Sequence, residues 1–287
     1  MHRAVTIWSE GARLAADLWA PDGIGAGEKL PAILLCHGWG GLKQHLNLTY
    51  APLFSRAGFI VLTFDYRGWG ESQPRLVPVG DVGEPDQNGE VTIRARAVRQ
   101  VVDPFDQIRD ITNCLDFLEG EPQVNTDRIG LWGTSYGGGH VSFMAAHDPR
   151  VKAIVAQAGA QQGALSSSSS IGRARAIARA RGEIGPIPPA EDGVQGLAGT
   201  PDFAKMVRYS PIATASQIRV PTLVIDAADE ELFDRMQNGH ALHEIVSKNA
   251  PARYVIFPCR HYAIYDQYYP DASALARDWF ITHLKNA

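Results

Sequence analysis

The chain has few cysteines, and their pattern excludes two kinds of stabilisation. Its three cysteines, Cys36, Cys114 and Cys259, are odd in number and far apart. This spacing fits neither a disulfide framework nor the clustered ligands of a metal site. Cys36 and Cys114 lie in apolar runs, which predicts that both are small residues of the core.

Long apolar runs and an excess of charge are also missing. No stretch is long enough to cross a bilayer, and residues 1–20 contain no apolar signal core, so we expect a cytoplasmic protein that has no membrane partner. The formal net charge of -4 over 287 residues gives no reason to expect nucleic acid or an anionic membrane as a partner. No internal repeat is visible.

What the chain does contain is an alternation of strand-like and helix-like segments. Nearly continuous apolar runs predict buried strands, and segments with helical spacing separate them. Such an alternation is typical of a mostly parallel sheet with helices on both faces, here as one α/β domain over residues 1–287. The predicted strands are 30–36, 59–64, 129–132, 151–155, 220–225 and 252–257. The predicted helices are 48–57, 103–118, 140–146, 235–248 and 272–284, and an N-terminal hairpin is predicted from strands 4–8 and 14–19.

Two segments interrupt this alternation. Residues 74–100 are polar and irregular, which predicts either a wall of the site or a plain surface loop. Residues 160–217 contain a serine run, four arginines between 173 and 181, and a proline-rich stretch. This segment is too long for a simple connection and predicts a cap or lid inserted over the carboxyl edge of the sheet. We expect the arginines to form a solvated helix face, with binding of a carboxylate as the alternative.

A glycine-flanked serine follows the apolar run 129–132. Gly133-Thr134-Ser135-Tyr136-Gly137 matches G-x-S-x-G, a turn so sharp that it needs small residues two positions before and after the serine. Such a turn lifts the hydroxyl above the sheet at the amino end of a helix, where negative charge is stabilised. The pattern is weak by itself, because an ordinary strand-to-helix turn can also match it.

Two further segments supply the groups that a serine nucleophile needs. His37-Gly38-Trp39-Gly40-Gly41 follows the strand 30–36 and predicts an oxyanion loop in which Trp39 donates its backbone N–H; a plain strand-end turn is the alternative. His261 directly follows the last strand and is the candidate base. The alternative for His261 is a histidine of a surface loop. The acidic turn after residue 225 leaves the third member open among Asp226, Asp229, Glu230 and Glu231.

Taken together, these segments resemble the α/β-hydrolase superfamily, in its branch of dienelactone hydrolases and acyl esterases or peptidases. The resemblance rests on residues 37–41, 65–72, 133–137, 221–233 and 261–265, and it spans most of the chain except 160–217. In the family's acid turn a glycine, two residues and an aspartate are followed by one residue and two apolar ones. Laid on this chain, the turn places the acid at Glu230, with Asp229 as the alternative.

The resemblance implies a two-step acyl transfer. Ser135 attacks a carbonyl, His261 takes its proton, Glu230 holds His261, and the backbone N–H groups of Trp39 and Tyr136 bind the oxyanion. It implies neither a metal nor an organic cofactor. Dienelactone hydrolases use cysteine as the nucleophile, so the serine favours a carboxylic ester or lactone hydrolase that acts on a small-molecule ester. A serine peptidase or amidase and a non-catalytic ligand-binding protein are the alternatives. The oligomeric state stays open, with a homodimer as one option.

Overall fold

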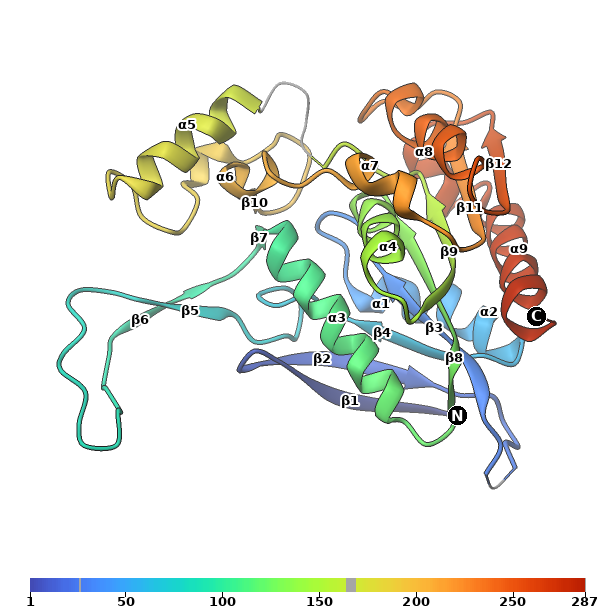
Figure 1. Cartoon of the computed structure of the whole chain (residues 1–287), viewed down its shortest axis with the longest axis horizontal. Coiled ribbons are helices and arrows are strands. Elements are labelled where there is room, and N and C mark those ends of the chain that lie inside the picture. The colour runs from blue at the N-terminus through green and yellow to red at the C-terminus, as the bar shows by residue number, and fades with distance from the viewer. Residues whose placement is uncertain (26, 164–168, 287) are drawn as a thin grey trace.

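An eight-stranded sheet organises the molecule (Figure 1). The computed structural model describes residues 1–25, 27–163 and 169–286. The strand order is β1-β2-β4-β3-β8-β9-β11-β12; β1 and β2 form an antiparallel hairpin, β2 pairs antiparallel with β4, and all later pairs are parallel. This arrangement confirms the predicted α/β-hydrolase fold class. The strands are β1 His2–Ser9, β2 Ala12–Trp19, β3 Leu30–Cys36, β4 Ile60–Phe64, β8 Val124–Thr134, β9 Val151–Gln157, β11 Thr222–Ala227 and β12 Ala252–Phe257.

Helices cover both faces of the sheet and create two separate cores. Successive residues of a strand point to opposite faces, so Leu34 of β3 packs in one core and Ile33 and Leu35 pack in the other. The first core lies under α3, α4 and α8, and the second lies under α2 and α9. The helices are α1 Lys43–Asn47, α2 Tyr50–Arg56, α3 Pro104–Gly120, α4 Tyr136–His147, α8 Gly239–Val246 and α9 Tyr269–Phe280. Cys36, Cys114 and Cys259 are buried free thiols.

A buried ion pair fixes the loop after β4. Arg67 donates to Asp110 Oδ1 through Nε at 2.9 Å and Nη2 at 2.7 Å, and its backbone N–H bonds Asp110 Oδ2 at 2.8 Å. The Ser9 hydroxyl also donates to Asp110, at 2.7 Å. Because both oxygens of the buried Asp110 carboxylate are hydrogen-bonded to Arg67, the cost of burying this charge is offset and the loop is held against α3.

Segment 74–100 differs from the irregular loop that the sequence suggested. β5 Arg75–Pro78 and β6 Ala95–Val98 pair as an antiparallel hairpin, and Figure 1 shows this hairpin extending away from the rest of the molecule. Beyond it, the two-residue strand β7 Val101–Val102 pairs in parallel with β10 Thr200–Pro201. The hairpin was missed because its long connection lacks the two-residue turn that signals a hairpin in sequence.

Segment 160–217 contains the helices α5 Ser169–Ala180, α6 Phe203–Met206 and α7 Pro211–Thr214, with 3₁₀ turns at Ala190–Asp192 and Ala215–Gln217. Its serine run falls partly outside the described residues. The predicted solvated arginine face is only half correct: Arg175 pairs with Asp192 and Arg179 with Asp202, at 2.8 and 2.9 Å, so both arginines brace the segment internally. The parts of the chain that the structure describes include no helix with the length and apolar character needed to cross a membrane.

Candidate active site

The turn at Ser135 has the geometry that the G-x-S-x-G pattern predicts. Ser135 adopts φ +53°, which is rare for a residue with a side chain, and α4 begins at the next residue. A Cβ at Gly133 would lie 2.3 Å from the carbonyl oxygen of Gly137, and one at Gly137 would lie 2.3 Å from that of Cys36. Only glycine fits at these two positions. Ser135 itself directly precedes α4, and the amino end of a helix favours negative charge.

Glu230 and His261 form a buried pair at the ends of neighbouring strands. Glu230 Oε2 lies 2.7 Å from His261 Nδ1, and the two side chains are 2% and 1% exposed. The other oxygen, Oε1, accepts the Leu232 N–H at 3.0 Å, while Glu231 accepts the His261 N–H at 2.9 Å. Nδ1 therefore carries the proton that it donates to Glu230, which leaves Nε2 as the basic nitrogen.

The other two acids of the turn lie elsewhere. The Asp229 side chain is exposed, and only its backbone N–H is engaged, with the Cys259 carbonyl at 3.0 Å. Asp226 is buried and accepts a hydrogen bond from the Tyr254 hydroxyl at 2.8 Å. Burial raises the pKa of Asp226 to about 7. Of the four carboxylates that the sequence left open, Glu230 is thus the one placed against the His261 ring.

Tyr265 connects the His261 ring to the serine turn. Its hydroxyl lies 2.6 Å from Thr134 Oγ1 and 3.5 Å from His261 Nε2. Within the described residues, the Ser135 hydroxyl itself makes no hydrogen bond, and the link from the His261 ring to the serine turn runs through Tyr265 and Thr134. Sequence reasoning assigned no role to Tyr265, although its position four residues after His261, in the same 3₁₀ helix, could have indicated contact.

The loop after β3 reaches the serine as predicted from its glycines. A Cβ at Gly38 would lie 2.8 Å from the Ser135 Cβ and 3.0 Å from the Thr134 carbonyl oxygen. The next residue, Trp39, packs its ring edge-to-face on Tyr136 at 5.7 Å. The Trp39 Nε1 also donates to the Ala198 carbonyl at 2.9 Å, which ties the loop to segment 160–217.

Two further histidines lie close to the turn but are inside the core. His140 is held between the Tyr209 hydroxyl at 2.6 Å and Gln107 Oε1 at 2.9 Å. His37 packs edge-to-face on Tyr66 at 4.5 Å. Burial lowers the pKa of His37 to about 4 and that of His140 to about 3, so both imidazoles are neutral at pH 7 and serve as structural groups.

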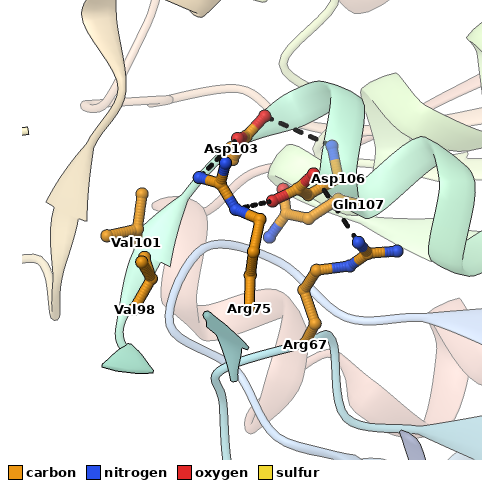
Figure 2. Close-up of a pocket in the computed structure, with 7 residues that line it drawn as sticks. All are labelled: Arg67, Arg75, Val98, Val101, Asp103, Asp106 and Gln107. Carbon is orange, nitrogen blue, oxygen red and sulfur yellow. Dashed lines mark hydrogen bonds and ion pairs between the residues drawn. The ribbon is translucent and has the colours of Figure 1, made fainter. Parts of the chain in front are cut away.

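A charged cavity lies away from the serine, at the amino end of α3 (Figure 2). Arg75 approaches Asp106 at 3.2 Å, Arg67 approaches the same carboxylate at 3.7 Å, and Lys205 of α6 pairs with Asp103. An adjoining cleft of about 510 Å³ shares Arg67, Arg75 and Asp106. Because these charges neutralise one another, the cluster ties the hairpin and α6 to α3. Within the described ranges no cluster of His, Cys, Asp or Glu is arranged to hold a metal ion.

Comparison with known proteins identifies the superfamily. The family model described as X-Pro dipeptidyl-peptidase (S15 family) matches residues 10–182, which is more than half of the chain. The chain belongs to this family. The S15 match and the structural neighbours agree that it is a hydrolase with the α/β-hydrolase fold.

Individual relatives of this S15-family chain extend over nearly its full length. An uncharacterized 31.7 kDa protein from the traX-finO intergenic region of Escherichia coli is 29% identical over 89% of this chain and 92% of its own. The structure of DcsB in complex with its substrate analogue aligns with TM-score 0.74 and 17% identity, covering 99% and 100% of the two chains. Est1E from Butyrivibrio proteoclasticus with ferulic acid bound aligns with TM-score 0.70 and 17% identity, covering 98% and 100%.

Proposed function

We propose that this chain is a serine hydrolase that cleaves carboxylic esters or lactones of small or medium size through an acyl-enzyme intermediate. Ser135 is the nucleophile, His261 the base and Glu230 the acid. The observation that carries the proposal is the buried pair of Glu230 and His261, 2.7 Å apart, which Tyr265 connects to Thr134, the residue before the serine of the strained turn that opens α4. No metal or organic cofactor takes part.

The geometry supports the following sequence of proton and bond changes. Ser135 Oγ bonds to the substrate carbonyl carbon while its proton moves to His261 Nε2, and Glu230 stabilises the imidazolium that forms. The backbone N–H groups of Trp39 and Tyr136 bind the negative oxygen; each such donor contributes about 3 kcal/mol. His261 then gives its proton to the leaving alkoxide. In the second step water, deprotonated by His261, attacks the acyl carbon, the bond to Ser135 Oγ breaks, and the carboxylic acid product leaves.

This sequence requires His261 Nε2 to bond the Ser135 hydroxyl. In the structure Nε2 instead lies 3.5 Å from the Tyr265 hydroxyl, which is at the outer limit of a hydrogen bond. Catalytic hydrogen bonds are often long in the absence of substrate and shorten in the complex. Since the Nε2–Tyr265 contact is weak, little energy opposes this change of partner.

Peptide cleavage is the second candidate, because the matching family model is described as a dipeptidyl-peptidase. An enzyme that removes dipeptides must bind a free amino terminus, for which a carboxylate at the site is the natural partner. Here Glu230 and Glu231 both bond His261, and Asp226 bonds Tyr254. These three carboxylates are engaged within the protein, which leaves Asp229, whose side chain is exposed, as the acid of this turn to be tested for binding an ammonium group. We rank ester cleavage first because the buried acids of the turn are already bonded.

The test combines covalent labelling with two substrate classes. Wild type, Ser135→Ala and the control Ser247→Ala are treated with a fluorophosphonate, then assayed on nitrophenyl esters of increasing acyl length and on Xaa-Pro nitroanilides. Ser247 is an exposed residue just after α8. We expect labelling and ester turnover in wild type and Ser247→Ala, and neither in Ser135→Ala.

Three other results would each redirect the assignment. Anilide cleavage that exceeds ester cleavage identifies a peptidase. Ester turnover that survives in Ser135→Ala refutes the mechanism. A folded wild type that neither labels nor turns over any substrate identifies a ligand-binding protein.

A further inference from the structure

The β5–β6 hairpin is here called the arm (residues 75–98). Among the described residues, neither of its strands pairs with a strand of the eight-stranded sheet. β5 and β6 pair only with each other, from Arg75 opposite Val98 to Pro78 opposite Ala95, and every residue from 78 to 97 is exposed. An isolated two-stranded hairpin is marginally stable in water. An arm of this kind therefore gains stability from a surface that covers it.

The arm also exposes apolar side chains in an otherwise polar stretch. Leu76 is 62% exposed and Val82 55%, and three more branched residues are exposed along both halves of the hairpin: Val79, Val91 and Ile93. Contiguous exposed apolar side chains rimmed by polar residues mark a protein-interaction site. The ion pair of Arg75 with Asp106, at 3.2 Å, anchors the base of the arm to α3.

A second uncovered apolar surface lies on α5, here called the α5 face (Ile171, Arg173, Ala174, Ile177 and Arg181). The opposite side of α5 packs on α6; a Cβ at Gly172 would lie 2.5 Å from the Phe203 carbonyl oxygen. Ile171, Ala174 and Ile177 follow helical spacing and point outward, with Ile177 49% exposed. The apolar stripe is thus flanked by two exposed arginines.

The outer part of the arm and the α5 segment carry opposite charge, whereas the base of the arm carries Arg75, Arg94 and Arg96. Between residues 79 and 93 the arm has four acidic residues and no basic one: Asp81, Glu84, Asp86 and Glu90. Residues 169–181, which are α5 and the residue after it, contain four arginines and no acidic residue. Arg175 and Arg179 are used within the segment, whereas Arg173 and Arg181 lie on the α5 face, where Arg181 contacts only Glu183 among the described residues.

We propose that two copies of this chain associate about a two-fold axis, with the arm of each copy packed against the α5 face of the other. Exposed apolar side chains of the arm pack on those of the α5 face, and the acidic outer part of the arm, residues 79–93, lies against Arg173 and Arg181. Figure 1 shows the arm and α5 on the same side of the molecule, so one two-fold axis brings both contacts together. The partner is a second copy because the matching surface is present on the chain itself.

Charge reversal with restoration tests this pairing on the full chain. The arm variant is Glu84→Arg with Glu90→Arg, the helix variant is Arg173→Glu with Arg181→Glu, and a fourth protein combines all four changes. All these side chains are exposed, so the variants are expected to fold, which circular dichroism checks. The control is Lys248→Glu, an exposed charge just after α8.

Dissociation constants are measured by sedimentation velocity over a dilution series. We expect wild type and the control to be dimers, each double variant to dissociate about tenfold more readily, and the combined protein to return to within about threefold of wild type. A wild type that stays monomeric up to high micromolar concentration overturns the proposal. So does a dimer that both double variants leave intact, or a combined protein that does not recover.

Discussion

The change Glu230→Gln measures how much the buried acid contributes to the proposed chemistry. The carboxylate contacts His261 Nδ1 at 2.7 Å, and both side chains are almost fully buried. When His261 gains a proton in the transition state, a unit charge forms about 4 Å from the carboxylate charge; at an effective dielectric constant of about 20 the attraction is about 4 kcal/mol. Glutamine has nearly the same shape as glutamate but no charge, so this attraction to the imidazolium is lost. At about 1.4 kcal/mol for each tenfold change, kcat/KM should fall about 10³-fold.

The assay is nitrophenyl-ester turnover, with kcat and KM determined separately. Because the missing attraction acts on a charge that exists only in the transition state, the loss should appear in kcat, with KM within about threefold of wild type. Asp229→Asn is the matched control, since it neutralises the adjacent acid, whose side chain is exposed, and it should stay within about threefold. The acid has been assigned to the wrong residue if Glu230→Gln retains a tenth or more of wild-type turnover. The same conclusion follows if Asp229→Asn loses turnover about 10³-fold.

Three further predictions follow from contacts around the site. Gly38→Ala should reduce ester turnover about 100-fold and destabilise the fold by about 1–3 kcal/mol, because the new methyl group would lie 2.8 Å from the Ser135 Cβ. The control is Gly83→Ala, where a Cβ meets open space; this change should alter neither turnover nor thermal stability. Tyr265→Phe should lower kcat about tenfold, since the hydroxyl that lies 2.6 Å from Thr134 Oγ1 and positions the residue before Ser135 is lost; an unchanged kcat would limit Tyr265 to packing. Asp226→Asn should raise the melting temperature at pH 8 but not at pH 4. The folded-state pKa of about 7 exceeds the ordinary 3.8, so wild type loses stability as pH rises between these values, whereas the asparagine variant does not. A larger gain at pH 4 than at pH 8 would refute this.

Local patterns in the sequence were sufficient to predict the sheet and the serine turn. Continuous apolar runs identified β3, β4, β8, β9, β11 and β12, and the glycines of the turn correspond to contacts that admit no Cβ. The preference for Glu230 rather than Asp229 as the acid came from the spacing of the family's acid turn. In the structure the Glu230 carboxylate lies against the His261 ring. Their catalytic roles, like that of Ser135, stay predictions.

Features that depend on distant partners could not be read from the sequence. The predicted helix 235–248 is a 3₁₀ turn followed by α8, because the Asn238 side chain leaves the helix pattern to accept the N–H groups of Gln161 and Gln162 at 2.6 and 2.9 Å. Helix α9 begins at Tyr269, three residues before the predicted start; Pro270 in its first turn was a signal that could have been used. The Arg67–Asp110 pair joins residues 43 positions apart, and no local pattern indicates it.

The strained backbone of Ser135 sets the proposed catalytic role of this residue against the stability of the fold. Its φ of +53° costs about 1–3 kcal/mol for a residue with a side chain. Three backbone hydrogen bonds hold it there: its N–H donates to Gln157, and its carbonyl accepts from Gly138 and Ala160. Glycine at this position would keep all three bonds without the strain. A library selected for thermal stability alone should therefore enrich glycine at residue 135, and the most stable version of this fold would lack the proposed nucleophile.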